Sequence, residues 1–330
     1  MGLKIGMTYD LRSDYLREGF TEDQVAEFDS DATIDAIEST LRELGHQPVR
    51  IGHGRALCAR LAAGDRWELV FNIAEGVSGR SREAQVPAML ELYSIPYVMS
   101  DPLVCCVTLD KAMTKRLVHA SGINTPAYRL VANLHEAEQV DLKYPLFAKP
   151  VAEGTGKGVD GLSRVDNPAR LHDLCKALLH KYRQPVLVEE YLPGREFTTG
   201  ILGTGPHARV LGTMEVTIAP HAPSRDYTYE IKEKCEELVV YRPLEHGALR
   251  VEVEELALKA YRVLECRDTG RVDVRVDASG RPAFIEINPL PGLHPHHSDL
   301  PMIATQEGMS YRDLIDHIVR SAASRAGLEV

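Results

Sequence analysis

The segment RVDVRVDASGRPAFIEINPLPG, residues 271–292, decides the fold expected for this chain. Apolar and polar residues alternate on both sides of the sequence ASGRP, and a period of two is typical of β-strands. ASGRP is itself a turn signal, because Gly280 can take a positive φ. The segment therefore predicts a β-hairpin. Its second strand is expected to carry Ala283, Ile285 and Ile287 on one face and Phe284, Glu286 and Asn288 on the other.

The polar positions of this hairpin are candidates for a metal site. A turn centred on residues 279–280 places Asp273 opposite Glu286 and Arg271 opposite Asn288, and directly opposed Cβ atoms lie about 4.5–5.5 Å apart. Two carboxylates and an amide oxygen at that spacing suit a hard divalent cation. The alternative is a hairpin whose polar face is only solvated, and a one-residue change in the turn would spoil the register. The following sequence, NPLPG, favours the first interpretation, since a rigid turn there can direct N–H groups at a ligand.

The bulk properties are those of a globular protein. The chain has 330 residues, 44% hydrophobic and 26% charged, which is enough for two or three domains. A net charge of −10 without a basic tract argues against a nucleic-acid or anionic-membrane partner. No apolar run approaches the roughly 20 residues of a membrane span, and the amino-terminus starts as a strand rather than as a signal segment. The six cysteines include no C-x-x-C motif, so we expect a reduced, cytoplasmic protein.

The first hundred residues show the pattern of an open α/β domain. Strands are expected at 3–10 and 67–73, and helices at 31–46 and 83–95. The first helix is the clearest of these elements. Its apolar positions fall on one face, namely Ile34, Ile37, Leu41 and Leu44, and Gly45 is a natural stop.

Two domain boundaries are expected in the chain. The sequence IPYVMSDP, residues 95–102, is interpreted as a further strand followed by a boundary, and a Pro-Gly turn lies near residue 193. The chain is thus divided into three predicted domains: 1–101, 102–193 and 194–330.

A glycine-rich loop, EGTGKGVDG at 153–161, follows a predicted strand at 144–150 that ends in Lys149 and Pro150. Backbone N–H groups in such loops cradle phosphates. The loop matches neither the P-loop pattern nor G-x-G-x-x-G, however, and a flexible hairpin tip would look the same. Lys149 is correspondingly either a snorkelling edge residue or a phosphate ligand.

Three further polar segments have two interpretations each. Glu189 and Glu190 end an apolar strand, where they are either solvent-facing or acceptors for a ribose hydroxyl and an adenine amino group. Lys232 lies in the charged segment 226–237, which would ordinarily be a surface loop. The sequence HPHHS at 294–298 suggests zinc, but no further ligand follows at zinc spacing, so a polar loop around a substrate carboxylate is favoured.

In their order along the chain, these features resemble the ATP-grasp superfamily, and most closely the D-alanine–D-alanine ligases. The motifs that carry the resemblance are FAKP with EGTGKG, VEEYLPGREFT, GRVDVRVD and EINPLPG, and together they extend over nearly the whole chain. The resemblance implies a three-domain α/β (α+β) architecture, with an amino-terminal open α/β domain and two α+β domains that clasp ATP. It also implies two Mg²⁺ ions, for which Mn²⁺ can substitute, small carboxylate and amine substrates, and a homodimer.

The resemblance further implies roles for individual residues. Lys111 and Lys149 correspond to lysines that hold the phosphates of ATP, and Lys232 to the lysine of a mobile loop that closes on the γ-phosphate. The implied adenine and ribose pocket consists of Glu189, Glu190, Leu192 and Glu196. The implied metal ligands are Asp273, Glu286 and Asn288. The implied catalytic and acceptor-binding groups are Arg271 and the Gly292 N–H as oxyanion donors, Thr155 of the glycine-rich loop, and Ser298.

This assignment is chemically coherent for a carboxylate–amine ligase. Cations offset the repulsion between a carboxylate and a triphosphate during phosphoryl transfer. An amine then attacks the acyl phosphate, and the tetrahedral oxyanion needs preorganised donors such as Arg271. Water must be excluded to prevent hydrolysis of the acyl phosphate.

The sequence departs from the ligases at the amino-acid site. NIAEGVSGRSREAQ stands where they carry a His-Gly…Gly-Glu-Asp-Gly run, so Asn72 holds the histidine's place and Glu75 is the retained carboxylate. Glu27 is the nearest candidate for binding a substrate ammonium, and the segment before it is long and acidic. We therefore expect an ATP-dependent ligase whose donor is not D-alanine, and a donor with a cationic group is one possibility. The alternatives are a true D-alanine–D-alanine ligase, a catalytically idle nucleotide-binding regulator, and an ATP-grasp kinase or carboxylase.

Overall fold

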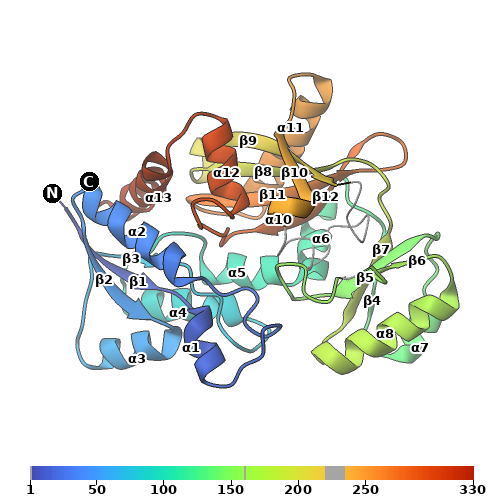
Figure 1. Ribbon diagram of the computed structural model, residues 1–330, viewed down its shortest axis with the longest axis horizontal. Helices are drawn as coiled ribbons and strands as arrows, with labels where there is room; N and C mark the ends of the chain where they lie inside the picture. Colours follow the sequence, from blue (N-terminus) through green and yellow to red (C-terminus); the bar gives the residue numbers. More distant parts are fainter. Residues whose placement is uncertain (1, 160, 220–234) are drawn as a thin grey trace.

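The computed structural model of the chain describes residues 2–159, 161–219 and 235–330. It contains three separate β-sheets that follow one another along the chain (Figure 1). The predicted boundary near residue 193 falls between two strands of different sheets, and the one near residue 101 falls just before a helix. The exact domain limits stay predictions. None of the described helices combines the length and apolar composition that a membrane crossing requires.

The first sheet is parallel and has the strand order β2-β1-β3. Its strands are β1 (Lys4–Thr8), β2 (Gln47–Gly52) and β3 (Leu69–Asn72). Its helices are α1 (Arg12–Arg17), α2 (Asp31–Glu43), α3 (Gly54–Ala62) and α4 (Gln85–Leu92), the last preceded by a 3₁₀ turn at Arg82–Ala84. The predicted helix face is confirmed, since Ile34, Ile37 and Leu41 are buried and Gly45 has a φ of 87°. The strand expected at 95–102 is wrong: among these residues only Tyr97 forms a bridge, to Val70.

Two helices lead to the second sheet, which is antiparallel with the order β4-β7-β5-β6. The helices are α5 (Pro102–Leu109) and α6 (Lys111–Ala120). The strands are β4 (Tyr128–Val131), β5 (Leu146–Pro150), β6 (Arg164–Val165) and β7 (Val186–Glu190). One face of this sheet packs against α7 (Leu134–Glu138) and α8 (Pro168–Tyr182). The glycine-rich loop joins β5 and β6, which pair as antiparallel strands. The loop is therefore the tip of a hairpin, as in the alternative interpretation of this segment.

The third sheet is antiparallel with five strands in the order β10-β9-β8-β11-β12. They are β8 (Glu196–Leu202), β9 (Arg209–Ile218), β10 (Val239–Pro243), β11 (Thr269–Val276) and β12 (Pro282–Asn288). The accompanying helices are α10 (Cys235–Leu238), α11 (Ala248–Val263), α12 (Asp299–Gln306) and α13 (Tyr311–Ala326), and a 3₁₀ turn lies at Gly205–His207. Helix α11 covers one face of the sheet, and α12 covers the other.

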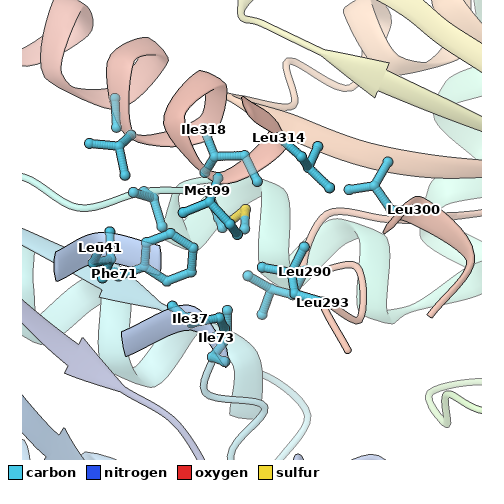
Figure 2. Close-up of a cluster of buried hydrophobic side chains, with 14 of the residues drawn as sticks. Ile37, Leu41, Phe71, Ile73, Met99, Leu290, Leu293, Leu300, Leu314 and Ile318 are labelled. Atoms are coloured by element: carbon cyan, nitrogen blue, oxygen red, sulfur yellow. The ribbon is translucent and has the colours of Figure 1, made fainter. Parts of the chain in front are cut away.

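The core beneath α12 and α13 joins the first and third sheets (Figure 2). Ile37 and Leu41 of α2 and Phe71 of β3 belong to the same buried cluster as Leu300 of α12 and Ile318 of α13. The amino-terminal region is thus fixed to the third sheet by a continuous apolar core, which positions the cavity between them.

The predicted hairpin is present as β11 and β12, and its register at the polar positions is confirmed. Asp273 opposes Glu286 and Arg271 opposes Asn288, while Gly280 has a φ of 88°. The predicted faces of β12 are wrong in one respect. The pairing shifts after Asp273, so that Val274 opposes Phe284 and Ile285 is the extra residue of a bulge. Phe284 therefore lies in the core with Ile287, while Ile285 lines the same cavity as Glu286.

Candidate active site

Two cavities meet at the hairpin. The first, here called the inter-sheet cavity, lies between the second and third sheets and is lined by residues of β5, β7, β8, β11 and β12, Lys149, Glu189 and Glu286 among them. The second, here called the N-terminal cavity, lies between the first and third sheets and has a volume of about 430 Å³. Arg271 and Asp299 line both cavities. They mark the point at which ligands in the two cavities would approach each other.

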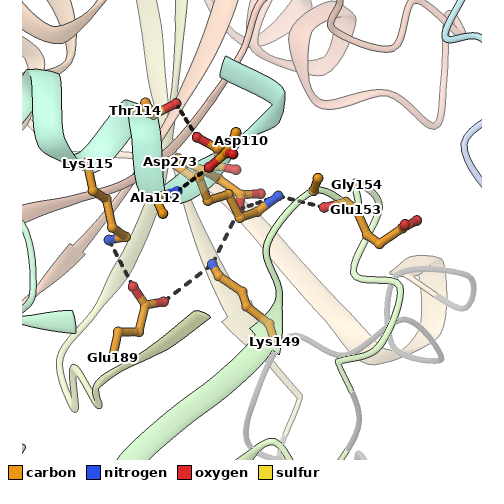
Figure 3. Close-up of polar contacts among 12 residues, drawn as sticks. Asp110, Ala112, Thr114, Lys115, Lys149, Glu153, Gly154, Glu189 and Asp273 are labelled. Atoms are coloured by element: carbon orange, nitrogen blue, oxygen red, sulfur yellow. Dashed lines mark hydrogen bonds and ion pairs between the residues drawn. The ribbon is translucent and has the colours of Figure 1, made fainter. Parts of the chain in front are cut away.

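A chain of buried ion pairs extends along the inter-sheet cavity (Figure 3). Lys115 of α6 lies 2.8 Å from Glu189 Oε2, and Lys149 of β5 lies 3.4 Å from Glu189 Oε1. The Lys149 ammonium also lies 3.4 Å from Glu286 Oε2, and the Lys111 ammonium lies 3.6 Å from the same oxygen. Lys111 further donates to the backbone oxygen of Glu153, at the start of the glycine-rich loop, at 2.6 Å. These ion pairs connect α6, β5, β7 and β12, which are far apart in the sequence.

Burial and pairing act against each other in this chain of ion pairs. Burial alone would raise the pKa of Glu189, but Lys115 and Lys149 lower it below its ordinary value. Burial would likewise lower the pKa of Lys149, but Glu189 and Glu286 raise it. Both groups therefore stay ionised at neutral pH, and Lys149 presents a full positive charge in the inter-sheet cavity.

The predicted metal ligands are brought together by the register of β11 and β12. Asp273 Oδ1 accepts a hydrogen bond from Thr198 at 2.9 Å, and Asn288 Oδ1 accepts one from the Leu290 N–H at 3.1 Å. Two carboxylates and an amide oxygen are the donors that Mg²⁺ prefers, so this set fits a magnesium site. Among the described residues, no three side chains of the His, Cys, Asp and Glu types form a metal-binding group, and the third donor here is an amide. The zinc interpretation of 294–298 receives no support.

Arg271 lies at the junction of the cavities and is held by two carboxylates. Its guanidinium donates to Asp273 at 3.2 Å and to Asp299 at the start of α12. Gly292 and Ser298 lie on the N-terminal cavity side. A Cβ on Gly292 would come within 2.7 Å of Ser298 Oγ, so any larger residue there would have to displace the Ser298 hydroxyl. The Ser298 hydroxyl accepts a hydrogen bond from the His294 N–H at 2.9 Å.

The predicted adenine and ribose residues line the other end of the inter-sheet cavity: Glu189, Glu190, Leu192 and Glu196. Tyr191 is fixed between two arginines, since Arg164 and Arg275 lie over its ring at 4.6 and 5.0 Å from the centroid. Arg275 also lies 3.5 Å from Glu196. The segment that connects β7 and β8 is thus anchored by these contacts beside the inter-sheet cavity.

The glycine-rich loop contacts the amino-terminal region through Glu27. One Glu27 oxygen accepts the Gly154 N–H at 2.8 Å, and the other pairs with Arg82. Arg82 also donates to the backbone oxygen of Ala152 at 2.9 Å. Thr155, next to Gly154, has a φ of 50° and lines the N-terminal cavity. Both oxygens of Glu27 are thus occupied, one by the loop and one by Arg82, which leaves Glu75 better placed than Glu27 to meet a ligand.

Glu75 and Asp29 line the N-terminal cavity among other carboxylates. Burial, together with the charges of Glu83 and Glu27, raises the pKa of Glu75 well above its usual value. Burial and the charge of Asp10 raise the pKa of Asp29 to about 7. Burial also raises the pKa of Glu83 to about 7, although Arg82 opposes the shift. Carboxyl groups are therefore crowded on this side of the site, and their raised pKa values favour the protonated form.

Some predictions fall outside what the structure describes, and some residues of the site were missed. Lys232 lies outside the described residues. Lys115, Thr198, Arg82 and Asp299 were not singled out from the sequence, although each contacts a predicted site residue. Lys115 follows Lys111 by one helical turn, so helical spacing could have indicated it. The other three contacts join distant segments and leave no local pattern.

The chain is similar to known proteins over most of its length. The family model described as D-ala D-ala ligase C-terminus matches residues 117–320. Protein y4sG of Sinorhizobium fredii is 34% identical over 308 residues, which cover 88% of this chain and 87% of that protein. The D-alanine–D-alanine ligase of Bordetella petrii is 35% identical over 275 residues, which cover 82% and 81%. The solved ligase of that name from Bacillus anthracis, complexed with ATP, covers 99% of both chains with a TM-score of 0.76 at 22% identity. This likeness confirms the three-domain ATP-grasp fold.

Proposed function

This chain belongs to the D-alanine–D-alanine ligase family of ATP-grasp enzymes, and we propose that its carboxylate donor is a substrate other than D-alanine. The chain is an ATP-dependent ligase that forms C–N bonds between a carboxylate and an amine. The single observation that carries the proposal about the donor is the crowding of carboxylates around Glu75 in the N-terminal cavity.

We propose that the reaction passes through an acyl phosphate. A carboxylate oxygen of the donor attacks the γ-phosphorus of ATP and displaces ADP. The free amine of the acceptor then attacks the acyl carbon and loses a proton, and phosphate leaves as the amide forms. In this scheme Lys111 and Lys149 bind the phosphates of ATP, while Arg271 and the Gly292 N–H stabilise the tetrahedral oxyanion. These roles are supported by the position of Arg271, which lines both cavities.

The remaining roles are proposed from position. Glu189, Glu190, Leu192 and Glu196 form the adenine and ribose pocket, and Ser298 binds the carboxylate of the acceptor. Asp273, Glu286 and Asn288 hold Mg²⁺, or Mn²⁺ in its place, and the ion supplies charge neutralisation at the phosphates. The assembled set of Arg271, Asp273, Glu286 and Asn288 argues against an idle regulatory protein. The expectations of two ions and of a homodimer rest on the family resemblance alone, and that of a cytoplasmic location rests on the cysteine usage and the amino-terminal sequence.

The donor is proposed to carry a second cationic group. Burial and the charges of Glu83 and Glu27 raise the pKa of Glu75, with Arg82 only partly opposing them, and burial and Asp10 raise the pKa of Asp29. A single ammonium neutralises one carboxylate, whereas a diamino acid brings two positive charges to the two carboxylates. A small uncharged side chain such as a methyl group would leave the second carboxylate unpaired, at a cost of about 1–3 kcal/mol.

Phosphate release tests the proposal directly. ATP and Mg²⁺ are supplied with D-alanine alone, with D-alanine mixed with other amino acids, and with D- and L-diamino acids. We expect the highest kcat/KM for a donor with a side-chain amine, and no ligation in excess EDTA. The proposal about the donor is wrong if D-alanine alone gives the highest kcat/KM and D-alanyl-D-alanine is the product. Full ligation in excess EDTA would refute the metal assignment instead.

A further inference from the structure

Lys115 is a buried lysine to which the proposed mechanism gives no role. Its side chain is fully enclosed, with an exposed fraction of 0%, so its ammonium cannot touch a bound ligand. The ammonium donates to Thr125 Oγ1 at 2.9 Å and lies 2.8 Å from Glu189 Oε2. A buried lysine is costly unless it is paired, and burial lowers the pKa of this one despite Glu189. The desolvation of the Lys115 ammonium is unfavourable, so we looked for a role that its contacts could have.

Glu189 connects Lys115 to the lysine that faces the inter-sheet cavity. One oxygen of Glu189 faces Lys115 and the other faces Lys149, at 2.8 and 3.4 Å (Figure 3). These two lysines are the charged groups that face Glu189, from α6 and β5 respectively. Because each oxygen has its own cation, the carboxylate cannot turn both oxygens toward Lys149.

Lys149 is also drawn toward Glu286, on the opposite wall of the cavity, at 3.4 Å. Its position is a balance between Glu189 and Glu286, which lie at equal distances. Without Lys115, Glu189 would have one cation for two oxygens, and this balance would shift toward Glu189. The ammonium of Lys149 would then be withdrawn from the end of the cavity where Lys111 and Glu286 lie.

We propose that Lys115 is a positioning residue of the nucleotide site, which acts through Glu189 to keep the Lys149 ammonium directed at the phosphates of ATP. Lys115 makes no contact with the nucleotide itself. The inference rests on the proposed role of Lys149 as a phosphate ligand, and it predicts an effect on ATP binding from a residue that is wholly inside the protein.

The test compares Lys115→Met with Arg116→Met in the full-length enzyme. Arg116 is the next residue of α6 and is exposed, so it controls for the loss of a cation from the same helix. We expect Lys115→Met to raise KM for ATP by about tenfold, the usual scale for removing a residue that supports a ligand. We expect kcat at saturating ATP to change by less than about threefold, and Arg116→Met to change neither constant.

A purely structural role would give a different result. It would lower the Tm of Lys115→Met and leave KM for ATP unchanged, which would overturn the inference. If Lys115→Met does not fold, Lys115→Gln removes the cation beside Glu189 while keeping a polar side chain, and calorimetric titration with ATP replaces the kinetics. Equal ATP affinity in Lys115→Gln and the parent would likewise overturn the inference, because the inference requires the second cation. Lys149→Ala distinguishes a failure of the proposed nucleotide site from a failure of the inference about Lys115. Unchanged ATP affinity in Lys149→Ala refutes the proposed site itself, whereas weakened affinity in Lys149→Ala but not in the Lys115 variants refutes only the inference.

Discussion

The inter-sheet cavity and the N-terminal cavity place carboxylates in opposite surroundings. In the inter-sheet cavity, Glu189 lies between Lys115 and Lys149, and Glu286 faces Lys111 and Lys149. In the N-terminal cavity, desolvation acts on both Glu75 and Asp29; Glu75 lies near Glu83 and Glu27, whose effect Arg82 partly offsets, and Asp29 lies near Asp10. The pKa of Glu189 is accordingly lowered, while those of Glu75 and Asp29 are raised. The difference teaches that the lysines hold Glu189 in its ionised form, whereas Glu75 and Asp29 are shifted toward their protonated form, and a cationic ligand would favour their ionisation.

The largest expected effect lies at Arg271, where the two cavities meet. Arg271→Ala should lower kcat by about 10²–10³-fold, the usual effect of removing an oxyanion donor. ATP affinity should be nearly unchanged, because the charge that this arginine meets appears only in the transition state. Steady-state kinetics and calorimetry check both parts. Arg281→Ala, at the exposed tip of the same hairpin, is the matched control and should have normal activity. A loss of ATP affinity as large as the loss of kcat would contradict the assignment.

The next effect concerns the inter-sheet cavity. Lys149→Ala should weaken ATP binding by about 10–100-fold, since a hydrogen bond to a charged group contributes about 1.5–3 kcal/mol. Calorimetric titration with ATP measures the change directly. The same variant should keep the parent's preference among donors, because Lys149 lies outside the N-terminal cavity lining. Equal ATP affinity in Lys149→Ala and the parent would count against the proposed nucleotide site.

In the N-terminal cavity, a substitution should change the preference among donors and leave ATP binding unchanged. Glu75→Gln removes one of the repelling carboxylates, so it should shift the kcat/KM ratio of diamino-acid to neutral donors by about tenfold toward neutral donors. KM for ATP should stay close to that of the parent. Competition assays with paired donors measure the ratio. If the ratio is unchanged in Glu75→Gln and in Asp29→Asn, the two cavities do not differ in the manner proposed.

The smallest effect is on stability. The pKa of Asp29 is raised to about 7 in the folded protein from an ordinary value of 3.8. The folded state therefore binds more protons than the unfolded state between these two values, and the contribution of Asp29 to stability is lost as pH rises from about 4 to 7. Asp29→Asn lacks this loss, so its Tm relative to the parent should rise by a few degrees across that window. Thermal unfolding measures this difference, with Glu252→Gln as an exposed control; a Tm difference that does not vary with pH would contradict the shift.

Short-range patterns in the sequence made much of the inter-sheet cavity predictable. The pairing of Asp273 with Glu286 was predicted from a turn centred on residues 279–280, and the structure confirms this pair. The pairs nearer the turn are shifted by one residue, as Val276 opposes Pro282, and the bulge at Ile285 restores the predicted register. The buried face of α2 and the stop at Gly45 followed from helical spacing in the same way. Strand β2 was not predicted, because its exposed and buried positions do not alternate. The bulge at Ile285 was also missed, since the sequence shows the same alternation with or without it.

The sequence by itself determined the strands and helices with regular periods, the family, and the residues that motifs place at strand ends. Only the tertiary structure decided that Lys115 pairs with Glu189, that Glu27 holds the glycine-rich loop, and that Glu75 faces other carboxylates. The physical reason is range. Periodicity arises from neighbours within a few residues, whereas the charge around a buried group depends on segments that folding brings together from distant parts of the chain.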